Sequence, residues 1–259
     1  MKTAFHTGVS GLVAYQHMLD TIGNNIANIN TVGFKRQSVS FEDLLYVRMN
    51  TKSAPDLLKG VGTKAAYTQL HADQGRVTYT GDGLDFTIAG DGFFQVDHDG
   101  RREFTRDGEF SIGLRSRRPY LTTSDGAYVL SMQGRRIELK EEFEERYVIT
   151  DGQISTEQVP TGRYDLSELL SEIGIFRFVN PHALEPVSST RYTATEASGA
   201  AARDNRGVCE LVQGYREQSN TVLSDEMEAM IRAQRAYQAS ARVVSTADQL
   251  EEIVNSLRN

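Results

Sequence analysis

Two amphipathic stripes, one at each end of the chain, constrain the fold more than any other feature of the sequence. The last 45 residues contain neither glycine nor proline, and the first proline is Pro55, so both ends favour long helices. Apolar residues recur there at alternating steps of three and four, which places them on one narrow helical face. A helix with so narrow an apolar face needs a partner surface. The sequence therefore predicts that the two terminal helices meet as a coiled coil, within one molecule or between neighbouring copies.

The members of the two stripes that we assign to the seam between the helices are large apolar residues. The N-terminal helix is predicted to end at 28–33, where asparagines and Gly33 favour turns, and the C-terminal helix to begin between Ser219 and Ser224. The N-terminal members are Val9, Leu12, Leu19, Ile22, Ile26 and Ile29, and the C-terminal members are Met227, Met230, Tyr237, Val244, Leu250, Val254 and Leu257.

The middle of the chain has a different character, because Asp-Gly pairs recur between short apolar runs. Asp-Gly readily adopts the positive φ angles of tight hairpin turns, so the pattern predicts antiparallel strands with short connections. Four of the runs cover residues 85–88, 93–96, 103–106 and 127–130. The acidic run 140–146 is interpreted as a solvated face. The predicted fold class is α+β, with long N- and C-terminal helices in a coiled-coil-like core and a central antiparallel β-rich domain.

Composition and motifs argue against several kinds of function. The 259 residues carry 28 basic and 35 acidic side chains, a net charge of −7, which disfavours nucleic-acid binding. The five histidines are scattered and Cys209 is the only cysteine, so the sequence indicates no metal site, no disulfide and no cofactor. No apolar run is long enough to cross a membrane or to form the core of a secretory signal. Since no catalytic motif is present either, we expect a protein that is not an enzyme.

Three motifs, in order, resemble those of flagellar rod and hook proteins along almost the whole chain. They cover residues 24–36, residues 84–96 with 104–110, and residues 213–220 with Glu226, Met227 and 234–237. The resemblance is strongest to the distal-rod members, through residues 34–37, 41–46 and 244–249. The residues that carry the family signature are Asn24, Asn25, Asn28, Asn30, Thr31, Gly33, Phe34, Gly90, Gly92, Phe93, Phe94, Ser219, Asn220, Gln234 and Arg235.

The resemblance implies a structural subunit of the bacterial flagellar basal body that polymerises into a hollow helical drive shaft, which transmits torque and passes exported subunits. Residues 1–34 and 217–259 are then the polymerisation core, 35–75 and 188–216 the connecting extended region, and 76–187 the outer β domain. The partners are further copies, other rod and hook subunits, and the flagellar type III export apparatus, with no membrane insertion. Export proceeds without a cleaved signal peptide, and Phe41 and Leu45 resemble the motif presented to the export gate; plain packing is the other interpretation of that pair.

Two departures from the family pattern leave alternatives open. The stretch between Tyr46 and Gly60 is shorter than in many distal rod proteins, which leaves room for a proximal-rod or hook-related paralogue. Arg216 stands where the family usually has an apolar residue, so its charge must reach solvent or a carboxylate. An interpretation from a different class is an enzyme or adhesin whose β domain is carried on a coiled-coil stalk; it requires convergent polar groups in a pocket.

Overall fold

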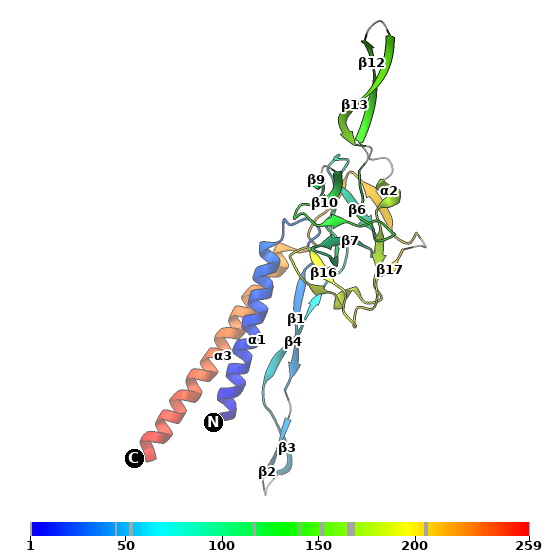
Figure 1. Ribbon diagram of the computed structural model, residues 1–259. Helices are drawn as coiled ribbons and strands as arrows, with labels where there is room; N and C mark the ends of the chain where they lie inside the picture. Colours follow the sequence, from blue (N-terminus) through cyan, green and yellow to red (C-terminus); the bar gives the residue numbers. More distant parts are fainter. Residues whose placement is uncertain are drawn as a thin grey trace. The chain divides into compact units, whose positions relative to one another are not determined.

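The computed structural model describes residues 2–44, 46–51, 54–115, 118–139, 141–150, 153–164, 169–204 and 207–258, and its fold is α+β (Figure 1). The chain divides into two compact units. The helical unit comprises Met1–Ile29, Lys35–His71 and Thr221–Asn259, and the sheet unit comprises Asn30–Phe34 and Ala72–Asn220. Each unit is therefore built from segments far apart in the sequence.

The helical unit contains the two long helices predicted for the chain ends. α1 (Lys2–Ala27) and α3 (Leu223–Arg258) lie side by side and run in opposite directions, so that both chain ends lie at the same end of the pair (Figure 1). A ribbon of antiparallel strands completes the unit: β1 (Gln37–Asp43) pairs with β4 (Thr63–Leu70), and β2 (Tyr46–Thr51) with β3 (Ala54–Gly60). The first turn of α3 holds Asp225 and Glu226, which suit the positive end of the helix dipole.

The sheet unit is built around an antiparallel sheet whose strand order is β15-β16-β8-β7-β11-β10-β9; in addition, β14 pairs with β7, and β17 pairs with β14. Three further two-stranded pairs are β6 with β18, β5 with β19 and β12 with β13. The bounds are β5 (Val77–Tyr79), β6 (Phe86–Ala89), β7 (Phe93–His98), β8 (Arg101–Thr105), β9 (Phe110–Arg115), β10 (Arg118–Thr123), β11 (Tyr128–Val129), β12 (Glu141–Thr150), β13 (Gln153–Tyr164), α2 (Leu169–Glu172), β14 (Ile175–Arg177), η1 (Pro181–Ala183), β15 (Glu185–Pro186), β16 (Arg191–Thr193), β17 (Ala202–Arg203), β18 (Glu210–Gln213) and β19 (Tyr215–Glu217).

Aromatic side chains fill the core of this unit. Phe86, Phe94 and Phe110 are almost completely buried, and the rings of Phe94 and Phe110 meet edge to face with 5.1 Å between centroids. The turn between β7 and β8 is formed by Asp99 and Gly100, both with positive φ (50° and 81°). The predicted antiparallel middle with Asp-Gly hairpin turns is therefore confirmed at this turn, because both residues adopt the conformation that such a tight turn requires.

Candidate self-assembly surfaces

α1 and α3 meet along a line of small side chains. On α3, Ala233 and Ala247 are buried and stand two heptads apart, with Ser240 midway between them. On the facing side of α1, a Cβ atom added to Gly8 would lie 2.7 Å from Val244 Cγ2, and one added to Gly11 would lie 3.0 Å from Ser240 Oγ. The two helices therefore approach closely because the residues between them are small.

A buried polar cluster ties the end of α1 to the start of α3. Glu226 is 3% exposed, and its carboxylate accepts hydrogen bonds from Asn25 Nδ2 (3.1 Å) and Arg36 Nη1 (3.4 Å). Asn25, 1% exposed, also bonds both backbone groups of Gln37, accepting from its N–H at 3.0 Å and donating to its carbonyl at 2.8 Å. Asn25 belongs to the N-terminal signature and Glu226 to the C-terminal motif, so the two motifs meet here in space.

The large apolar residues of the predicted seam lie beside this buried line, and the single chain covers them unevenly. Ile22 is buried. The half-buried members are Leu12, Leu19, Ile26, Ile29, Met230 and Val244. The exposed members are Val9, Met227, Tyr237, Leu250, Val254 and Leu257. Leu250 also borders an apolar groove of about 300 Å³ that is lined by Ala4, Arg242, Val243, Thr246 and Ala247.

Only the first residue of the predicted export motif, Phe41, lies among the described residues. Phe41 is in β1, at a register shift after Ser40, and remains 37% exposed. Its ring contacts Tyr15 of α1 with 5.7 Å between centroids. Leu45, the second member of the motif, lies outside the described residues.

A buried ion pair anchors the interior of the sheet unit. Arg106 Nη1 lies 3.1 Å from Glu217 Oε2, and both side chains are 1% exposed. Arg106 also donates to the carbonyl of Gly90 at 2.6 Å and lies over the ring of Phe93, while Glu217 Oε1 accepts the N–H of Gly75 at 2.7 Å. Sequence reasoning missed this pair, although two of its neighbours, Gly90 and Phe93, are signature residues.

The remaining signature residues hold the segments that enter and leave the sheet unit. The N–H of Gly33 donates to the carbonyl of Glu217 (2.8 Å), and the N–H of Asn220 donates to the carbonyl of Phe34 (3.4 Å). Gly33 has φ +68° and touches the backbone of Asp107 so closely that an added Cβ would lie 2.3 Å from its nitrogen. Of the other signature residues, Gly92, Phe94 and Ser219 are buried and Thr31 is half-buried. Asn28 donates a hydrogen bond to Asn24. The exposed signature residues are Asn30, Gln234 and Arg235.

Arg216 finds carboxylate partners at the surface of the sheet unit, as its charge requires. Its guanidinium lies 2.7 Å from Asp85 Oδ2 and 3.2 Å from Glu109 Oε1. Close to Arg216, burial raises the pKa of the Asp107 carboxyl to about 6. The charges of Glu109 and Asp125 also raise this pKa. The backbone N–H of Glu109 and the charge of Arg216 lower it. Asp107 is thus held in a setting that disfavours its ionised form.

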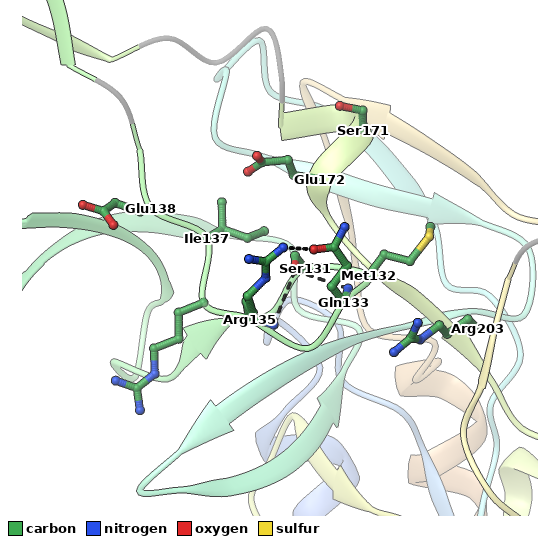
Figure 2. Close-up of a pocket in the computed structure, with 10 residues that line it drawn as sticks. Ser131, Met132, Gln133, Arg135, Ile137, Glu138, Ser171, Glu172 and Arg203 are labelled. Carbon is green, nitrogen blue, oxygen red and sulfur yellow. Dashed lines mark hydrogen bonds between the residues drawn. The ribbon is translucent and has the colours of Figure 1, made fainter.

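A polar groove of about 610 Å³ opens between the turn at 131–138 and α2, and Figure 2 shows the side chains that line it. Arg135 donates to Gln133, and Ser131 Oγ accepts the backbone N–H groups of Gln133 and Arg135 at 3.3 and 3.4 Å. These polar groups bond each other, and Glu172 lines the groove from the opposite element (Figure 2). Within the part of the chain that the structure describes, no group of histidine, cysteine and acidic side chains is arranged to hold a metal ion. The described helices also contain no apolar stretch long enough to cross a bilayer.

The chain matches three family models, in the order of its own motifs. They are described as "Flagella basal body rod protein" (residues 5–35), "Flagellar hook protein FlgE/F/G D1 domain" (87–156) and "Flagellar basal body rod FlgEFG protein C-terminal" (212–257). It is 36% identical to the flagellar basal-body rod protein FlgG of Borreliella burgdorferi, over 100% of this chain and 99% of the relative. In Bacillus subtilis it is 34% identical to FlgG and 26% identical to the flagellar hook-basal body complex protein FlhP, over the full length of both chains in each case.

Proposed function

Because the chain belongs to the flagellar basal-body rod protein family, we propose that it is a structural subunit of the distal rod, which polymerises with its own copies and joins other rod and hook subunits. The preference for the distal rod rests on identity: the FlgG relatives are 30–36% identical to the chain, whereas FlhP is 26% identical. The subunit carries out no catalysis and needs no cofactor. Its place is the basal body of the flagellum.

The observation that carries this proposal is the apolar surface that the terminal helices leave open. Leu250 is 47% exposed, Val254 46% and Leu257 82%, on a helix whose buried line is already filled by α1. Burial of such surface contributes roughly 25 cal/mol per Å². Contacts between unlike surfaces of successive copies, when the rotation does not close, build an open helical tube. In this proposal the exposed stripe packs on neighbouring copies as a coiled coil, and the tube is hollow and transmits torque.

The functional parts follow from this arrangement. Residues 1–34 and 217–259 form the polymerisation core, 35–75 and 188–216 connect it, and 76–187 form the outer domain. The chain leaves the cytoplasm through the flagellar type III export apparatus without a cleaved signal. Phe41 and Leu45 form the motif that the export gate binds. Support for that role is the exposure of Phe41 on an edge of the helical unit.

The test compares Leu250→Asp with Gln249→Asp, a change at the preceding residue, which is exposed but lies outside the stripe. A carboxylate placed in a desolvated contact costs several kcal/mol, so Leu250→Asp should abolish filament growth by the purified chain and rod assembly in cells. Gln249→Asp introduces the same charge outside the stripe and should assemble normally. Electron microscopy counts the filaments formed by the purified chain, and the swimming of cells reports rod assembly. Normal assembly by Leu250→Asp would remove the stripe from the polymer contact.

A further inference from the structure

One face of the central sheet gathers arginine and tyrosine side chains. Tyr128 of β11 is paired in register with Asp97 of β7 and with Thr122 of β10. The ring of Tyr120 packs on Tyr128 with 5.7 Å between centroids, and the guanidinium groups of Arg136 and Arg115 lie 4.3 and 5.7 Å from the centre of the Tyr128 ring. Arg118 lies opposite Arg115 in register. We name the surface formed by Arg102, Arg115, Arg118, Arg136, Tyr120 and Tyr128 the arginine face.

The arginine face is positively charged on a chain that is negative overall. Asp97 pairs with Arg136 (2.6 Å) and Glu138 with Arg118 (3.4 Å), the latter pair being well exposed. Among the described residues, neither Arg102 nor Arg115 has a carboxylate within ion-pair distance, and both are exposed. Arginine and tyrosine are the residues enriched at energetically important points of protein interfaces. The face therefore suits an acidic polypeptide surface.

The hairpin formed by β12 and β13 is the acidic element of the same chain. Within the described part of the chain its strands pair only with each other, and it extends away from the rest of the sheet unit (Figure 1). The sequence of β12 begins Glu-Glu-Phe-Glu-Glu, with glutamates at 141, 142, 144 and 145. A two-stranded hairpin on its own is marginally stable in water, so a ribbon of ten and twelve residues gains stability from a surface that covers it.

We propose that the hairpin β12–β13 of one copy docks on the arginine face of a second copy. The four glutamates give this short segment a charge opposite to that of the arginine face, and the contact joins unlike surfaces, as an open polymer requires. The contact rests on the proposed function, since it is a second bond between subunits of the same rod. It lies in the sheet unit, and the terminal stripes have no part in it.

The experiment measures pairwise association of full-length chains in the Leu250→Asp background, so that the terminal stripe does not contribute. One chain is immobilised on a sensor and the other flows over it at 50 mM and at 500 mM salt. One variant carries Arg115→Glu with Arg118→Glu, the other Glu144→Lys with Glu145→Lys. The matched control, Glu185→Lys with Glu210→Lys, makes the same change of charge at exposed residues of β15 and β18.

The parent chains should bind one another at 50 mM salt and weaken about tenfold at 500 mM salt, because surface charges are screened. Each reversed variant should bind its own copies at least tenfold more weakly, the control should bind as the parent does, and a mixture of the two reversed variants should recover binding. Absence of binding between parent chains, or a mixture that fails to recover, overturns the proposal. A chain that carries all four changes provides a further comparison. If the mixture fails to recover binding and only this chain recovers it, the hairpin docks on the sheet of its own copy, and the proposal is overturned. Since Leu250→Asp is present throughout, these results do not depend on the outcome of the filament test.

Discussion

Arg106 and Glu217 stand 111 residues apart in the sequence, yet their side chains meet at 3.1 Å inside the sheet unit, each 1% exposed. The pair joins the loop after β8 to the end of β19. Glu217 in turn receives the N–H of Gly75 through its side chain and that of Gly33 through its carbonyl. One ion pair thus holds the segments through which the chain enters and leaves this unit.

Removing the carboxylate should therefore unfold the sheet unit readily. Glu217→Ala leaves the Arg106 charge buried without its counter-charge, which costs about 3–5 kcal/mol of unfolding free energy. Glu210→Ala, at the exposed first residue of β18, is the control and should change stability by less than about 0.5 kcal/mol. Chemical denaturation followed by circular dichroism measures both. A loss below 1 kcal/mol for Glu217→Ala would show that the pair is not needed for stability.

Asp107 should make stability depend on pH. Its folded pKa of about 6 lies above the ordinary value of 3.8, so the folded state holds the proton more tightly than the unfolded state. The stability that this group contributes is fully present below about pH 4 and is lost as pH rises through 6. Asp107→Asn keeps an acceptor for the N–H of Glu109 and should stabilise the protein by about 3 kcal/mol at pH 7 and by less than about 1 kcal/mol at pH 4. An equal gain at both pH values would exclude a protonation effect.

Gly33 should tolerate no side chain, whereas Gly126 should tolerate alanine at modest cost. Both have positive φ (+68° and +83°), which costs an L residue roughly 1–2 kcal/mol, but only Gly33 touches neighbouring backbone. We expect Gly33→Ala to lower the unfolding free energy by about 2 kcal/mol more than Gly126→Ala, because the Asp107 backbone must move. Thermal unfolding compares them. Equal losses would mean that the close approach at Asp107 relaxes freely.

Gly8 and Gly23 test the contact between α1 and α3 in a similar way. Both lie within α1, but an added Cβ at Gly23 meets nothing within 4 Å, whereas at Gly8 it lies 2.7 Å from Val244. Gly23→Ala should stabilise the helix by up to about 1 kcal/mol, because alanine is the better helix former. Gly8→Ala should destabilise the helical unit by about 1 kcal/mol through overpacking. Loss of the helical circular-dichroism signal on heating measures the stability of both variants. A stabilising Gly8→Ala would mean that the helices are free to separate.

The export motif is tested against a variant that breaks the same ring contact. Phe41→Ala and Tyr15→Ala each remove the contact between the two rings, so their effects on stability should be similar. Only Phe41→Ala alters the motif, and the amount of chain secreted by cells should fall severalfold for Phe41→Ala alone. Immunoblots of cytoplasmic and exported fractions measure this. Equal secretion by the two variants would leave Phe41 with a packing role only.

The sequence predicted the elements well where a local rule decides them. The absence of glycine and proline after Gly214, together with the apolar spacing, gave the long helix α3, and Asp99-Gly100 gave a hairpin turn. Apolar spacing found the helix contact only in part. The seam residue Val244 faces Gly8, whereas Met227 is exposed and the small residue Ala233, outside the predicted stripe, is buried.

The polar contacts were beyond local reasoning for a different reason. Asn25 and Glu226 are separated by 201 residues, and neither periodicity nor turn chemistry says which buried polar groups will pair across such a distance. The motifs that contain them were recognised as a family signature, but their physical role emerged only when the fold placed them together.

The bond from the Gly33 N–H to the Glu217 carbonyl has a consequence for the order of events during synthesis. The ribosome delivers residue 33 long before residue 217, and a contact between segments so remote forms late, because the intervening chain must first be brought into a closed loop. This bond therefore forms only when translation is nearly finished. In the export proposed above, its late formation would leave the two ends of the sheet unit unjoined while the chain is being exported.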